Sequence, residues 1–182
     1  MHLFPYFMRR ALRQAFEVLR ADGDTSAARD ILNRAIDWFE SRPLDEAMDE
    51  DHREEYGLAL FHAGRQDEAR EVMDALVQDS EYPYLVNYRG TRASIAVAQG
   101  DTAQAIEDEE WLAGVDPPYV RGHPIFWRAV VVAALGRREE AVMLRRQAYE
   151  LGMFYFWHQE VQSLLDPLRG YQPFEEFVRP KG

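Results

Sequence analysis

The chain has 182 residues, and its hydrophobic fraction of 47% is enough to form a core in one compact domain or in a short stack of repeats. It contains no cysteine, which excludes disulfides, thiolate nucleophiles and cysteine-ligated metal sites. The net charge of -11 argues against a nucleic-acid partner, because phosphate binding needs a basic surface.

Glycine punctuates the chain at regular intervals, inside strings that resemble one another. Gly23, Gly64, Gly100 and Gly136 follow one another at spacings of 41, 36 and 36 residues. An alanine follows each glycine by five residues, and a small residue precedes three of them by seven. These small residues are Ala28, Ala69, Ala105 and Ala141 after the glycines, and Gly57, Ala93 and Ala129 before them.

The spacing predicts a unit of helix, tight turn and helix. Each glycine can adopt the left-handed backbone conformation that ends a helix, and Asp24 and Asp101 follow two of them as N-caps of the next helix. The two small positions, one on each helix, let the pair cross closely. Since a single hairpin cannot bury its apolar face, the units must stack on one another.

Apolar residues recur with helical spacing along the whole array, and strand-type alternation is absent. The pattern predicts four helix pairs within a repeat array at residues 1–152. In chain order the helices cover residues 4–21 and 25–40, 50–63 and 66–79, 84–98 and 102–113, and 124–135 and 138–151. The corresponding units are at about 4–40, 50–79, 84–113 and 124–151.

A closing segment follows at residues 153–182. We expect a short helix near 157–165, a turn at Asp166-Pro167 and a second short helix near 173–178. This segment would cap the exposed face of the last unit, because a stack of repeats otherwise ends on an apolar surface.

The combination of a small residue in the first helix, a turn glycine and an alanine five residues later resembles the tetratricopeptide repeat (TPR) family. The similarity spans about residues 10–151. It implies an all-α fold, a right-handed superhelical stack of about four helix–turn–helix repeats. The first unit departs from the family pattern, since Phe16 stands where a small residue is expected. The segment from Leu165 to Val178 is similar to the one that closes many bacterial multidomain TPR regulators, which implies that the chain is the C-terminal part of a longer protein.

The N-terminal residues do not have the pattern of a signal peptide, in which positive charges come before an apolar run. Here the apolar residues come before Arg9 and Arg10, and Pro5 interrupts them. No apolar run reaches the roughly 18 residues that a membrane span requires. We therefore expect a cytoplasmic protein with no membrane partner.

Motifs that carry catalytic chemistry are absent from the sequence. The histidines form no HExxH motif, the serines no nucleophile elbow and the glycines no phosphate-binding loop. The single lysine is Lys181. The acidic pairs Glu109-Glu110 and Glu139-Glu140 fall on second helices, where we expect exposed surface residues. The sequence thus predicts no enzyme, no metal and no cofactor.

In the TPR family the first helix of each pair lines a concave groove, so the resemblance implies where a partner binds. The candidate groove residues on this mapping are Leu58, Phe61, Asn87, Val97, His123, Phe126 and Val130. The clamp of lysines and asparagines that binds a C-terminal carboxylate in this family is not reproduced, because the mapped positions lack lysine.

The implied function is a scaffold or adaptor that binds a protein or peptide segment, with the partner's apolar side chains beside residues such as Phe126 and Val130. Two other occupants of these apolar positions stay open: the chain's own terminal segment, or a second copy of the chain in a homodimer. The alternative function is an enzyme or a small-molecule sensor. Its cavity would lie near His123 and the acidic second helix pair, at residues 50–79.

Overall fold

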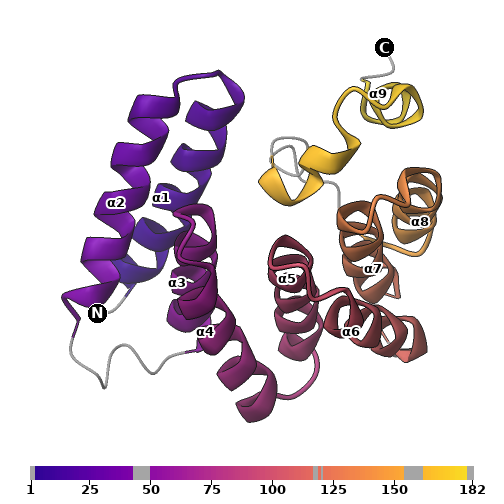
Figure 1. Cartoon of the computed structure of the whole chain (residues 1–182), viewed down its shortest axis with the longest axis horizontal. Helices are drawn as coiled ribbons and strands as arrows, with labels where there is room; N and C mark the ends of the chain where they lie inside the picture. Colours follow the sequence, from indigo (N-terminus) through magenta and orange to yellow (C-terminus); the bar gives the residue numbers. More distant parts are fainter. Residues whose placement is uncertain (1–2, 43–49, 117–118, 120, 154–161, 180–182) are drawn as a thin grey trace. The chain divides into compact units, whose positions relative to one another are not determined.

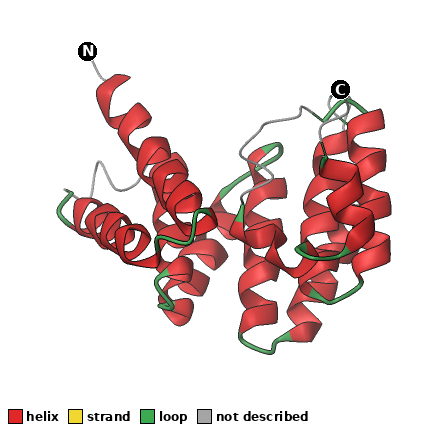
Figure 2. Ribbon diagram, turned by 90° about the horizontal axis from the view of Figure 1, so that it is seen from above, coloured by secondary structure: helices red, strands yellow, loops and turns green. Residues whose placement is uncertain are grey.

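A computed structural model of the chain describes residues 3–42, 50–116, 119, 121–153 and 162–179. In these ranges every regular element is a helix (Figure 2). The elements are α1 (Leu3–Ala21), α2 (Thr25–Glu40), α3 (Glu50–His62), α4 (Gln66–Asp79), α5 (Tyr84–Ala98), α6 (Thr102–Gly114), α7 (Gly122–Ala134), α8 (Arg138–Glu150), the 3-10 helix η2 (Ser163–Leu168) and α9 (Gln172–Val178).

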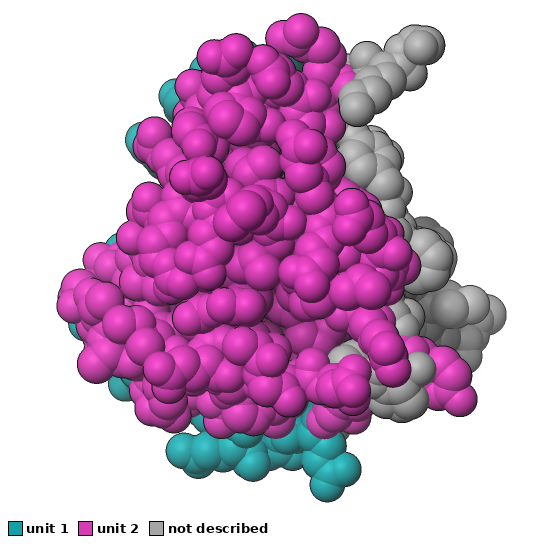
Figure 3. All heavy atoms as spheres, turned by 90° about the vertical axis from the view of Figure 1, so that its right-hand side faces the viewer, with its two compact units in different colours: residues 1–81 teal, residues 82–182 magenta. Residues whose placement is uncertain are grey.

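The eight long helices α1 to α8 confirm the four predicted pairs, because each begins and ends within two residues of its predicted bounds (Figure 1). The described helices form two compact units, residues 1–81 and 82–182, which Figure 3 shows in different colours. Unit 1 holds α1 to α4, and unit 2 holds α5 to α9. None of the helices in the described ranges is long and apolar enough to cross a membrane.

Consecutive helices pack against each other as hairpins. In unit 1, α1 packs on α2 and α3 on α4, and in unit 2, α5 packs on α6 and α7 on α8. Within each unit the hairpins also contact each other, through α2 and α3 in unit 1 and through α5, α6 and α7 in unit 2. This sequential pairing is consistent with a stack of helix hairpins.

The four turn glycines adopt one conformation, which explains their regular occurrence. Gly23, Gly64, Gly100 and Gly136 have φ between 80° and 83°. In each turn the glycine N–H and the next N–H donate back to carbonyls three and five residues earlier, as from Gly136 to Ala133 and from Arg137 to Val132. This pair of bonds is the Schellman motif, which ends a helix in a left-handed residue. The predicted turn is confirmed in all four pairs.

The helix after each turn begins in one of two ways. Asp24 and Asp101 act as the predicted N-caps, since their carboxylates accept hydrogen bonds from the backbone three residues later. The other two turns carry an arginine at this position. Arg65 and Arg137 each form an ion pair with the glutamate three residues later in the first turn of the helix.

Small residues allow the two helices of a pair to pack closely, as predicted. A Cβ atom added to Gly57 on α3 would lie 2.5 Å from Met73 Cε and 3.1 Å from Val72 Cγ1 on α4. The alanines at the equivalent positions are completely buried: Ala69, Ala93, Ala105, Ala129 and Ala141. In the first hairpin Phe16 replaces the small residue and packs in a core with Ala28 and Leu32.

The C-terminal segment packs on the last hairpin. η2 contacts α7, and α9 contacts α8. The predicted turn at Asp166-Pro167 is wrong, because both residues lie inside η2. A proline fits there since its fixed φ of about −65° falls within the range of a 3-10 helix. The second short helix is confirmed as α9, and the predicted helix near 157–165 lies mostly outside the described residues.

Candidate functional site

Two predicted groove residues of unit 2 meet on the face formed by α5 and α7. Asn87 and His123 both stand 13 residues before their turn glycines, Gly100 and Gly136, and so occupy the same position in consecutive hairpins. His123 Nε2 lies 2.8 Å from Asn87 Oδ1. Both side chains are partly exposed. Stacking of the two hairpins therefore places equivalent residues side by side on an accessible face.

Trp127 completes this cluster, and sequence reasoning missed it. The Trp127 indole Nε1 donates a hydrogen bond of 2.8 Å to the same Asn87 oxygen. A Cβ atom at Gly90 would lie 2.4 Å from Trp127 Cε3, so the indole packs directly on the backbone of α5. The available signal was its position four residues after His123, which places both side chains on one face of a helix.

The environment of His123 keeps its imidazole neutral. Burial lowers the pKa of His123 below its usual value, because the charged imidazolium loses hydration. Its Nε2 must carry the ring proton, since Asn87 Oδ1 can only accept a hydrogen bond. The cluster is therefore uncharged and made of hydrogen-bonding groups.

Phe126 and Val130 are not open to a partner, which corrects the prediction for the apolar part of the groove. Only 3% of Phe126 and 0% of Val130 are exposed. They belong to one core cluster with three buried residues of the C-terminal segment, namely Leu165, Leu168 and Phe174. The chain's own terminal segment, one of the alternatives left open, occupies these positions. The pattern of apolar residues cannot show this, because it does not reveal which surface covers them.

Three further groove candidates lie elsewhere. Val97 on α5 is partly buried and packs against a second core of unit 2 that includes Ala93 and Val131. Leu58 and Phe61 belong to unit 1, where Leu58 is only 8% exposed and Phe61 is partly exposed beside the His62 ring.

Unit 1 contains a buried polar cluster at α1 and α3. Arg13 Nε donates to Glu55 at 2.7 Å, and Arg20 pairs with Glu17, which is only 4% exposed. His62 Nε2 lies 3.8 Å from Glu17, too far for a hydrogen bond. Burial is the main cause that lowers the pKa of His62 to about 3, and the positive charges of Arg13 and Arg20 add to it. The imidazole is therefore neutral despite the nearby Glu17 carboxylate.

A small cavity of about 20 Å³ adjoins this cluster. It is lined by residues of unit 1 alone: Leu12, Arg13, Phe16, Leu32, Ala35, Phe39, Glu55, Ala59 and His62. A cavity of this size holds about one water molecule. His123 is not among its lining residues.

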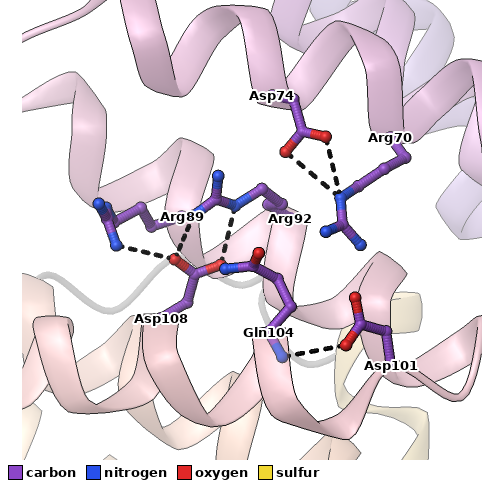
Figure 4. Close-up of polar contacts among 7 residues, drawn as sticks. All are labelled: Arg70, Asp74, Arg89, Arg92, Asp101, Gln104 and Asp108. Carbon is purple, nitrogen blue, oxygen red and sulfur yellow. Dashed lines mark hydrogen bonds and ion pairs between the residues drawn. The ribbon is translucent and has the colours of Figure 1, made fainter.

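Buried ion pairs join α5 to α6 in unit 2. Asp108 is completely buried and accepts hydrogen bonds from Arg89 and Arg92, whose guanidinium groups point at its carboxylate in Figure 4. Arg89 also lies over the Trp111 ring, with Cζ 4.7 Å from the centroid. A charged residue on the apolar side of a second helix was not foreseen from the sequence.

Glu109 corrects the expectation that the acidic pairs lie on the surface. It is only 7% exposed and accepts a hydrogen bond from Arg128 Nε on α7. Arg137 adds an ion pair at 3.6 Å and also binds Glu140 at 2.6 Å. Of the residues expected at the surface, Glu110 and Glu139 are exposed and Glu140 is partly buried. These charges join consecutive hairpins of unit 2.

Within the described ranges no three His, Asp or Glu side chains gather in a way that could hold a metal ion. A scan against protein-family models finds no matching family, and searches of the curated proteins and of the solved structures find no match either.

Proposed function

We propose that this chain is a helical-repeat scaffold that binds a segment of a protein partner on the face of unit 2 formed by α5 and α7. The contact between Asn87 and His123 supports this most directly. Two side chains at the same repeat position meet and stay partly exposed, as expected where first helices line a binding face. By its resemblance to TPR regulators, the chain would supply the partner-binding part of a longer protein.

The chemistry of this face favours a partner that makes polar contacts beside a limited apolar area. Asn87, His123 and Trp127 are all partly exposed and offer hydrogen-bonding groups and one aromatic ring. The deeper apolar positions at Phe126 and Val130 are filled by the C-terminal segment, so the partner does not insert side chains there.

Site-specific photo-crosslinking tests the proposal. A photoreactive amino acid at Tyr84, which is 50% exposed and lies one turn before Asn87 on α5, should crosslink to a defined segment of one protein in cell extract, identified by mass spectrometry. The same group at Met143 provides the control, because Met143 lies on α8 and is 59% exposed. Crosslinks to the same partner from Met143 and none from Tyr84 would place binding on another surface and reject the proposal.

A further inference from the structure

The Trp127 indole decides which way the Asn87 amide faces. The amide can turn over, which exchanges its oxygen and its nitrogen. His123 alone would permit both orientations, because a neutral imidazole can donate or accept at Nε2. The Trp127 Nε1 atom lies 2.8 Å from Asn87 and can only donate, so the Asn87 atom beside it must be the oxygen. The contact of the same oxygen with His123 Nε2 at 2.8 Å then requires a proton on Nε2.

Close packing holds the Trp127 ring against α5. A Cβ atom at Gly90 would lie 2.4 Å from Trp127 Cε3 and 2.8 Å from Cδ2, so the ring rests on the backbone of α5. Phe126 meets the ring edge-on, with centroids 5.8 Å apart. The indole donor therefore has a fixed place relative to Asn87, which stands three residues before Gly90 on the same helix.

This orientation leaves the Asn87 NH2 group unused by the other two residues. In the part of the chain that the structure describes, Nδ2 forms no hydrogen bond. Two other polar atoms of α5, Thr91 Oγ1 and Arg89 Nε, are buried without a hydrogen-bond partner among the described residues, and Asn87 Nδ2 does not belong to this group. Nδ2 therefore reaches the surface, and Asn87 as a whole is partly exposed.

We propose that Asn87 orients the bound partner segment by donating a hydrogen bond from Nδ2 to a main-chain carbonyl oxygen, and that Trp127 is the positioning residue that keeps Nδ2 available. This inference rests on the proposed function and names the atom that contacts the partner's main chain. A donor held in place loses little conformational entropy when it binds. Every residue of a partner segment carries a carbonyl acceptor, so this bond sets the position of the segment without selecting a side chain.

A neutral acceptor suits this position better than a carboxylate. Burial lowers the pKa of His123 below its usual value, so all three residues of the cluster are uncharged at neutral pH. A carboxylate would lose hydration against them without forming an ion pair with them, whereas a carbonyl loses less. The neighbouring arginines in sequence, Arg89 and Arg128, already bind Asp108 and Glu109.

The positioning role of Trp127 is testable without a partner. In Trp127→Phe the indole donor is removed, while an aromatic ring can still pack on Gly90. The Asn87 amide can then turn over and donate from Nδ2 to His123 Nε2, which moves the ring proton to Nδ1. Nitrogen chemical shifts of the His123 ring should show Nε2 protonated in the wild type and a clear share of Nδ1-protonated ring in the variant. The same single form in both proteins would overturn the role of Trp127.

Two further proteins support this measurement. A benzothienyl analogue of Trp127 replaces the indole N–H by sulfur and keeps its shape, so it takes the place of Trp127→Phe if that variant loses helicity. It should change the His123 ring in the same way. Trp111→Phe is the matched control, because the Trp111 ring packs against Arg89 on the other hairpin helix α6. It should leave the His123 ring unchanged.

Short random peptides displayed on phage provide the probe for binding. Peptides selected on the wild-type protein are kept if they shift the NMR signals of the Asn87 side-chain NH2 group. Each carbonyl of a kept peptide is then replaced by a thiocarbonyl, a weaker acceptor that leaves the peptide N–H in place. One of these replacements should lower the affinity about fivefold.

Variants of the protein assign this loss to Asn87. Asn87→Asp still accepts from Trp127 and His123 but has no N–H group, so it should weaken binding about tenfold and remove the thiocarbonyl effect. Trp127→Phe should weaken binding about fivefold in the wild type and add nothing to Asn87→Asp, because it acts through Asn87. Asn33→Asp, at an exposed position of α2, is the control and should leave the affinity unchanged.

Several results would overturn the inference. If no thiocarbonyl matters and Asn87→Asp binds like wild type, the face binds peptides without this bond, and the proposed function stands. If the loss follows an amide or acidic side chain of the peptide, Asn87 does not bind the main chain. Additive losses in the double variant would show that Trp127 contacts the peptide directly. If no displayed peptide binds the wild-type protein at this face, both the inference and the proposed function fail.

Discussion

Arg92 donates hydrogen bonds to both carboxylate oxygens of Asp108. Nε donates to Oδ2 at 2.9 Å and Nη2 to Oδ1 at 2.6 Å, while Asp108 is completely buried and Arg92 is 8% exposed (Figure 4). A two-point contact of this kind sets the position of α5 relative to α6, because the planar guanidinium must face the carboxylate. Arg89 adds a third bond of 3.0 Å to the same carboxylate.

Asp108→Ala should destabilise unit 2 strongly. Removing the carboxylate breaks the buried ion pairs that Asp108 forms with Arg92 and Arg89. Loss of one partner of a buried pair typically costs about 3–5 kcal/mol. Urea unfolding followed by circular dichroism measures this cost. The control is Asp116→Ala, whose partner Arg121 is 3.6 Å away with both side chains largely exposed. Such surface pairs contribute about 0–1 kcal/mol, so equal losses in the two variants would contradict the buried ion pair.

Gly136→Val should lower stability through backbone strain alone. The residue has φ of 81°, which a β-branched side chain rarely adopts, and no atom lies within 4 Å of an added Cβ. We expect a loss of about 1–3 kcal/mol, and the same for Gly64→Val. Gly114→Ala is the control, because it ends α6 with open space and without a positive φ. Thermal melts that match wild type for both valine variants would reject the assignment of these turns.

The stability of unit 1 should fall as the pH decreases below about 6.5. The pKa of His62 is about 3 in the folded protein, below its usual value of 6.5, so between these values the unfolded chain binds more protons. Stability therefore rises with pH across this window, and lowering the pH from about 6.5 to about 5 should cost about 2 kcal/mol. In His62→Gln this part of the pH dependence should vanish. An identical slope in wild type and variant would show that His62 is not buried in its neutral form.

Phe126→Ala should lower the stability of unit 2. Its ring lies in a core with Leu165, Leu168 and Phe174, and truncation of a buried phenylalanine costs about 3–5 kcal/mol. Calorimetry should show a much lower melting temperature, whereas Met143→Ala, at an exposed position of α8, should melt like wild type. A variant that keeps its melting temperature but loses its protein partner would show that Phe126 contacts the partner directly.

Deletion of residues 153–182 should leave a less stable protein that self-associates. The buried cluster around Phe126 and Val130 would lose the side chains of η2 and α9 that cover it. An exposed apolar face of this kind promotes association. Light scattering at increasing concentration and thermal melts give the readout. A monomeric truncated chain with an unchanged melting temperature would mean that the segment does not cap unit 2.

Local features of each hairpin follow from the sequence alone. The turn glycines, the N-caps Asp24 and Asp101 and the small residue at Gly57 are all predicted and all occur as expected. Each depends on residues within one hairpin. A left-handed turn needs glycine and a close crossing needs a small side chain, so the requirement appears in the sequence itself.

The candidate site was only half predictable. The family resemblance assigned Asn87 and His123 to one face, and the two side chains are in contact, but Trp127 was missed and Phe126 was assigned to an open groove. Repeat position assigns a residue to a face of its helix. It does not show which other residues hold it or cover it.

The sequence by itself therefore determined the helices, their turns and their pairing, because neighbouring residues impose these through backbone conformation and capping. Only the tertiary structure decided that the C-terminal segment covers Phe126, that Glu109 and Asp108 are buried with arginines, and that Asn87 is held by its oxygen. These features join residues from separate helices, and burial changes their chemistry. A charge that looks like surface on one helix becomes part of the interior when the next hairpin packs against it.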